Sequence, residues 1–103
     1  MTPFTEKVIA IICAIPEGQV MTYGQIARLA GSPRAARQVV RVLHAMSKKH
    51  RLPWHRVVNA RGEIAIQDAE GAELQRFLLV SEGIDISEGG LVVLEQYQLA
   101  TKE

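Results

Sequence analysis

The chain has 103 residues, of which 48% are hydrophobic and 22% charged, with a formal net charge of +1 and one cysteine. This length supports one hydrophobic core and excludes a two-domain enzyme with its own cofactor-binding half, while the apolar content excludes a disordered chain. With no second cysteine for a disulfide, no apolar run near the roughly 18 residues of a membrane span and no basic signal-peptide start, we expect a cytoplasmic single domain over residues 1–103.

The first part of the chain predicts two helices in succession. Residues 3–15 carry apolar side chains at helical spacing and follow Thr2, a good N-cap, with proline at the first helical position. Thr22 can cap a shorter helix, and Gly31 marks its end.

A third helix follows the next cap-and-proline pair, Ser32-Pro33, and has two different faces. Its apolar residues are expected to point inward, and they are Ala36, Val39, Val40, Leu43 and Met46. Its basic residues lie on another side, and they are Arg34, Arg37, Arg41 and His44. Two short helices around a Gly-Ser-Pro turn, the second rich in arginine, are typical of a helix-turn-helix.

The second half predicts a small β-hairpin and one more helix. Segments 56–59 and 63–66 flank an Ala-Arg-Gly turn in the manner of two short strands. Asp68 can cap a helix over residues 69–82, and segment 91–94 fits a final strand or a helical turn equally well. The elements together predict a mainly α domain with a small β-hairpin, similar to a winged helix-turn-helix.

The charges are segregated along the sequence. Nine of the twelve cations lie between Arg28 and Arg61, a stretch without Asp or Glu, whereas residues 62–103 hold two cations and nine acids. Such a block favours a polyanionic partner, nucleic acid above all. The alternative is a solvated face that the acidic C-terminal part neutralises.

Residues suited to metal binding or nucleophilic catalysis do not gather. The three histidines have no cysteine nearby, and glycine-rich phosphate or dinucleotide motifs are absent, so we expect no metal and no cofactor. Cys13 lies in an apolar helix, where a cysteine is usually a small buried hydrophobe. An enzyme that uses Cys13 as its nucleophile is the alternative.

The most informative segment is 53–58, Pro-Trp-His-Arg-Val-Val. Trp54 lies between a basic loop over 48–53 and a predicted strand. An indole in this position can fill the core, or it can stack on a nucleobase beside the neighbouring cations. These features alone leave both interpretations open.

The segment 53–57 resembles the Pro-Cys-His-Arg-Val motif of the O6-alkylguanine-DNA alkyltransferases, with Trp54 at the position of the acceptor cysteine. That substitution marks the alkyltransferase-like proteins, which bind alkylated DNA without accepting the alkyl group. Segments 20–27 (Val-Met-Thr-Tyr-Gly-Gln-Ile-Ala), 31–39 (Gly-Ser-Pro-Arg-Ala-Ala-Arg-Gln-Val) and 81–83 (Ser-Glu-Gly) resemble further family motifs in the same order. The resemblance covers nearly the whole chain and implies the fold of the alkyltransferase C-terminal domain.

The resemblance implies a DNA interface in the minor groove. Arg37 matches the arginine finger that takes the place of the flipped base, and Tyr23 matches the tyrosine that drives nucleotide rotation. Ala35 and Ala36 match small positions that let the helix approach the groove, and Ser32 matches a phosphate contact at a helix N-terminus. The implied DNA-binding residues are Tyr23, Ser32, Arg34, Ala35, Ala36 and Arg37.

The resemblance also implies a lesion pocket without chemistry. The backbone carbonyls of Trp54 and Val57 match those that meet the exocyclic amine of guanine, and Gln67 falls where a lining side chain is expected. His55 and Glu82 occupy the positions of the relay that activates the acceptor cysteine, but an indole cannot accept an alkyl group. The implied pocket residues are Tyr23, Trp54, Val57 and Gln67, and none is expected to be catalytic.

The sequence therefore predicts a non-enzymatic sensor that binds O6-alkylguanine in duplex DNA and flips the lesion into a pocket. The resemblance implies handover to nucleotide excision repair proteins, and we expect a monomer without membrane contact. The alternative of another class is a winged-helix transcription regulator that reads the major groove. Its recognition helix should offer Asn, Gln or Arg to base edges, where this chain has Ala35 and Ala36.

Overall fold

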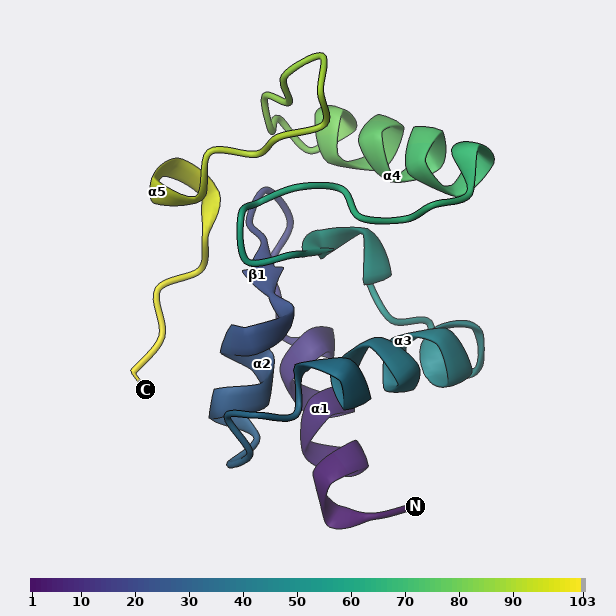
Figure 1. Ribbon diagram of the computed structural model, residues 1–103, viewed down its shortest axis with the longest axis vertical. Coiled ribbons are helices and arrows are strands. Elements are labelled where there is room, and N and C mark those ends of the chain that lie inside the picture. The colour runs from purple at the N-terminus through teal and green to yellow at the C-terminus, as the bar shows by residue number, and fades with distance from the viewer. Residues whose placement is uncertain (103) are drawn as a thin grey trace.

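The computed structural model describes residues 1–102, which are mainly helical, as predicted (Figure 1). In chain order the elements are α1 (Pro3–Cys13), β1 (Met21–Thr22), α2 (Tyr23–Leu29), α3 (Ala36–His50), the 3-10 helix η1 (Trp54–Arg56), β2 (Val57–Val58), α4 (Ala69–Ser81) and α5 (Leu94–Tyr97). Within residues 1–102, no helix is long and apolar enough to cross a membrane.

Helices α1, α2 and α3 pack together around the larger of two apolar clusters, in the lower half of Figure 1. Val8 and Ile12 from α1, Ile26 from α2 and Val39 from α3 are fully buried there. Helical spacing of apolar residues creates these faces, and their burial is the main source of stability for such short helices.

The two short strands separate this cluster from the second one. Successive side chains of a strand point to opposite faces, and accordingly Val57 packs into the cluster of α1–α3 while Val58 packs into the other. The second cluster joins β2 to α4 and the C-terminal segment, and its buried members are Val20, Val58, Leu79, Ile84 and Val92. The segment that carries Trp54 therefore lies between two cores that fix it from both sides.

The predicted hairpin is wrong in its pairing. Strand β2 runs parallel to β1, with Met21 opposite Val57, whereas Glu63 forms an isolated antiparallel bridge with Leu91. The chain does turn between the two segments, since Gly62 N donates to Asn59 O at 2.9 Å. Because both strand valines are buried, this strand needs cover on both faces, which a two-stranded hairpin at the surface would not supply.

The helix N-caps at Thr22 and Asp68 are confirmed. The Thr22 hydroxyl accepts from Gln25 N at 3.1 Å, and the Asp68 carboxylate accepts from Gly71 N at 2.9 Å. The Gln25 side chain in turn accepts from Thr22 N, which completes a capping box, and it donates to Leu99 O. This buried glutamine therefore ties the C-terminal segment to α2.

Several helix boundaries differ from the prediction. Helix α1 ends at Cys13, and α4 ends at Ser81, one residue before the expected end. Helix α3 begins at Ala36 because the Ser32-Pro33 pair forms a turn of its own, in which Ala35 N donates to Ser32 O. It also continues to His50, so half of the predicted 48–53 loop is helix.

The undecided segment 91–94 combines both alternatives. Leu91 and Val92 form isolated bridges, and Leu94 begins the short helix α5.

The turn at Gly62 gives a sharp test of this arrangement. Gly62 has φ of +85°, and a Cβ there would lie 2.3 Å from Val92 O, whereas Gly31 has φ of +89° with open space around it. Gly62→Ala should therefore lower the free energy of unfolding by about 3 kcal/mol or more, and Gly31→Ala by about 1 kcal/mol, the cost of the left-handed backbone alone. Denaturant unfolding of both variants measures this difference, and equal losses would contradict the close approach of residues 62 and 92.

Candidate nucleic-acid interface

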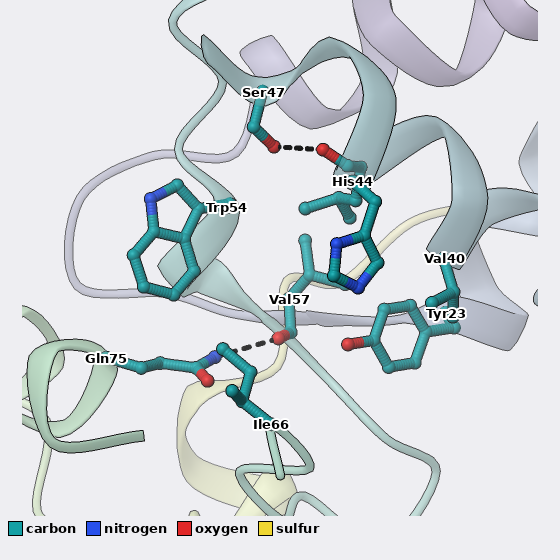
Figure 2. Close-up of a pocket in the computed structure, with 9 residues that line it drawn as sticks. Tyr23, Val40, His44, Ser47, Trp54, Val57, Ile66 and Gln75 are labelled. Atoms are coloured by element: carbon teal, nitrogen blue, oxygen red, sulfur yellow. Dashed lines mark hydrogen bonds between the residues drawn. The ribbon is translucent and has the colours of Figure 1, made fainter. Parts of the chain in front are cut away.

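A cavity of about 230 Å³ opens beside the Trp54 segment (Figure 2). Tyr23, Trp54 and Val57, three of the predicted pocket residues, line it together, although they come from α2, η1 and β2. The full lining is Tyr23, Val40, Leu43, His44, Ser47, Trp54, Val57, Ile66 and Gln75. The walls are thus mainly apolar and aromatic, which suits the faces of a planar ring.

Gln67, which was predicted as a wall residue, is not among the residues that line this cavity. Its side chain is exposed, while the preceding residue, Ile66, contributes to the wall. Side chains alternate in direction along an extended segment, so an error of one position selects the wrong one.

Gln75 is a lining residue that the sequence analysis missed. It lies one turn before the buried Leu79 on α4, a spacing that could have marked it as inward-facing. Its Nε2 donates to His55 O and to Val57 O, both at 3.0 Å, and the residue is only 2% exposed. These two bonds hold α4 against the segment that carries Trp54. Within residues 1–102 the Oε1 atom of Gln75 has no hydrogen-bond partner, so one acceptor remains unused.

Tyr23 begins α2 directly after its N-cap, Thr22, and Figure 2 shows its ring on the wall opposite Trp54. Burial raises the pKa of Tyr23, so the phenol stays protonated at neutral pH and keeps its hydrogen for donation. The capping box sets the direction in which this first residue of α2 projects. Tyr23 is therefore a fixed hydrogen-bonding ring at the edge of the cavity.

His55, Arg56 and Glu82 form one compact network behind the cavity. Glu82 Oε2 lies 2.7 Å from His55 Nε2 and accepts from Arg56 Nη2 at 2.8 Å, while Glu82 Oε1 accepts from Gly18 N at 3.1 Å. Arg56 Nη1 also donates to Ile15 O at 2.9 Å. The two relay positions named in the sequence analysis thus meet in the structure, and an arginine binds the same carboxylate.

This network controls the charge state of Glu82. Burial raises the pKa of Glu82, but the hydrogen bonds from Arg56, His55 and the Gly18 amide outweigh it and lower the pKa to about 2. Glu82 is therefore an anion throughout the physiological range. Its partner Arg56 is a cation of the basic block that is committed to the interior, with 17% of its side chain exposed.

Cys13 takes no part in the cavity. It is exposed on α1, so the expectation that it is a buried hydrophobe is wrong. It follows the buried Ile12 by one position, which turns its side chain about 100° around the helix, away from the core. None of the described lining residues is a cysteine, and within residues 1–102 no three His, Cys, Asp or Glu side chains gather as metal ligands would.

Four of the six predicted DNA-binding residues gather between α2 and the start of α3, whereas Tyr23 begins α2 and lines the cavity, and Ala36 begins α3 outside this group. Ser32, Arg34, Ala35 and Arg37 line one open hollow at the α2–α3 turn. The amides of residues 36–38 have no partner within α3, because the helical ladder begins with Val39 N donating to Ala35 O. Ser32 lies before α3 and not at its N-terminus. The helix-terminal amides that favour an anion are therefore those of residues 36–38.

A cationic stripe continues from this hollow along α3. Arg37, Arg41, His44 and Lys48 recur at intervals of three and four residues, so they share one helix face, and all four are exposed. Apart from Arg56, every cation of the 28–61 block is exposed. The stripe and the cavity share His44, so a polyanion along α3 would pass the cavity mouth.

Comparison with known proteins gives consistent results. Residues 3–84 match the family described as 6-O-methylguanine DNA methyltransferase, DNA binding domain. The chain is 47% identical over 95 residues to the DNA base-flipping protein of Escherichia coli (strain K12), covering 92% of this chain and 73% of that protein. It is 41% identical over 92 residues to Alkyltransferase-like protein 1 of Schizosaccharomyces pombe, covering 88% and 85%.

The fold is similar to that of a solved structure. The crystal structure of S. pombe Atl1 in complex with damaged DNA containing O6-carboxymethylguanine matches with a TM-score of 0.87 and 37% identity, over 98% of both chains.

The Glu82 network predicts a specific acid sensitivity. Because the pKa of Glu82 falls from 4.5 to about 2 on folding, its contribution is complete above pH 4.5 and is lost as the pH falls toward 2. Wild-type unfolding free energy should lose roughly 2–3 kcal/mol through this group over that range. Glu82→Gln, less stable at neutral pH, should show a flatter profile there in urea unfolding at a series of pH values. Parallel profiles for the two proteins would contradict the network.

Proposed function

This chain belongs to the family of alkyltransferase-like proteins, and from that premise we propose that it senses O6-alkylguanine in duplex DNA without repairing it. The observation that carries the proposal is the cavity between Tyr23 and Trp54, beside the cationic face of α3, with an indole at the position that the sequence resemblance assigns to the acceptor cysteine. The protein binds the lesion, holds it extrahelically and leaves its alkyl group in place.

Charge and shape of the α3 surface support DNA as the partner. The stripe from Arg37 to Lys48 supplies cations for the phosphate backbone, and the free amides at the start of α3 supply further phosphate donors. Ala35 and Ala36 offer no side chain that could read base edges, but they allow the helix to approach a narrow groove closely. We infer minor-groove binding from this combination.

The neighbouring residues support nucleotide flipping. A substituent on O6 of guanine cannot be enclosed while the base remains stacked, so the base must leave the duplex. Arg37 is exposed at the hollow beside the α3 N-terminus, and its planar guanidinium can stack in the vacated place. Tyr23 and Trp54 then receive the extrahelical base between aromatic walls.

The chemistry of the cavity supports binding without transfer. Alkyl transfer requires a nucleophile within reach of the alkyl carbon, and the described lining residues provide no thiol. Glu82 is engaged by Arg56 as well as by His55. A lesion that the sensor leaves in place must be removed by other proteins. We therefore propose that this protein passes the lesion to nucleotide excision repair proteins, and that it acts as a cytoplasmic monomer.

Flipping can be tested with a 2-aminopurine reporter beside O6-methylguanine. Wild-type protein should raise the fluorescence, because the neighbouring base becomes unstacked when the lesion leaves the duplex. Arg37→Ala should weaken binding by about 1–3 kcal/mol, the size of a lost stacking or good polar contact, and should raise the fluorescence less at saturation.

The matched control is Arg41→Ala, which removes a cation one turn further along the same stripe. It should weaken binding only slightly and keep the wild-type fluorescence at saturation, since Arg41 contacts at most a phosphate. An Arg37→Ala protein that raises the fluorescence as much as the wild type would refute the assignment of Arg37.

A further inference from the structure

The cavity has one polar end, formed by α3. His44 and Ser47 lie there, and Figure 2 shows the imidazole of His44 across the cavity from the indole of Trp54. The Ser47 hydroxyl donates to Leu43 O within the helix. Ser47 therefore has no hydrogen left for a ligand, whereas His44 has no hydrogen-bond partner within the described residues.

The electrostatic surroundings of His44 are positive. Arg41 and Lys48 lie about one turn away on either side of it along α3, and α3 contains no Asp or Glu. Among the residues that line the cavity from the other elements, the only titratable side chain is Tyr23, which stays neutral. No carboxylate of the lining competes for the imidazole, so this end of the cavity favours an anionic or hydrogen-bond-accepting group.

The O6 substituent of a bound guanine should point toward this end. An acceptor side chain at position 54 would have to reach the alkyl carbon, so this first carbon lies beside Trp54 when the base occupies the cavity, and the rest of a longer substituent extends from it into the cavity. A substituent that extends away from Trp54 reaches the opposite wall, where Tyr23 and His44 carry hydrogen-bond donors, and His44 is the donor that lies between cations of α3.

We propose that His44 reads the charge of the O6 substituent, so that lesions carrying a carboxylate bind more tightly than neutral lesions of the same size. This proposal rests on the proposed function and names the lesion class that the same cavity prefers. A charge-assisted hydrogen bond from the imidazole to the carboxylate supplies the preference, and the neighbouring cations reinforce it.

The test compares two adducts of nearly equal size, O6-carboxymethylguanine and its neutral amide, O6-carbamoylmethylguanine, in the same duplex at the same salt concentration. The dissociation constant for the amide should exceed that for the carboxylate by about three- to tenfold in the wild type. His44→Leu should reduce this ratio to near one, while His44→Arg, which places a cationic hydrogen-bond donor at the position, should preserve it.

Two controls separate this role from simpler ones. Arg41→Gln should weaken binding of both adducts by the same factor, as expected for a phosphate contact. If His44→Leu also weakens both adducts equally and leaves their ratio unchanged, His44 is only a phosphate contact and the proposal is wrong. If neither adduct binds better than unmodified guanine, the proposed function itself fails, which is a different result.

Discussion

The carboxylate of Glu82 joins three parts of the fold that are far apart in sequence. Through Arg56 it is linked to Ile15 O after α1, and through its own backbone it ends α4. Gly18 N donates to the same carboxylate from the turn before β1. Desolvating such a pair costs much of what the attraction returns, but removing one partner leaves a buried charge unpaired. The network therefore specifies geometry more than it adds stability.

That geometry determines where Trp54 lies. The ring of His55, held by Glu82, meets the indole edge to face with centroids 6.1 Å apart. Gln75 holds the backbone of the same segment through His55 O and Val57 O. The backbone of the segment that carries Trp54 is thus fixed by contacts that do not depend on the indole, and the ring contact with His55 orients the indole itself.

The structure gives His55, Glu82 and Arg56 roles that their positions in the sequence do not indicate. The sequence resemblance assigns His55 and Glu82 to a relay. In the structure the two side chains bind each other and help to hold the segment that carries Trp54. Arg56 belongs by sequence to the basic block, yet it binds Glu82 and is not part of the exposed cationic surface. The exposed cations and the Arg56–Glu82 pair are therefore two separate groups of charges in the structure.

The features that the sequence predicted correctly are local ones. Thr22 and Asp68 cap the helices that follow them because a cap involves only the next three residues. The grouping of Tyr23, Trp54 and Val57 is the exception, because it followed from the family motifs and not from local pattern, and the structure brings the three residues to one cavity.

The features that the sequence could not supply depend on distant partners or on exact register. The partner of β2 is β1, far away along the chain, and nothing in the alternation of residues 56–66 identifies it. Ile66 lines the cavity where the sequence predicted its neighbour Gln67. Arg56 is turned inward because it binds the carboxylate of Glu82 at the end of α4, which is far away along the chain.

The central claim is that this protein encloses a lesion without reacting with it. Its most direct test is mass spectrometry of the intact and digested protein after incubation with a duplex that carries labelled O6-methylguanine, under conditions where a gel shift shows that the duplex is bound. The account predicts an unchanged protein mass and a lesion recovered intact from the DNA. A mass gain of one methyl group on any residue, Cys13 included, would contradict it.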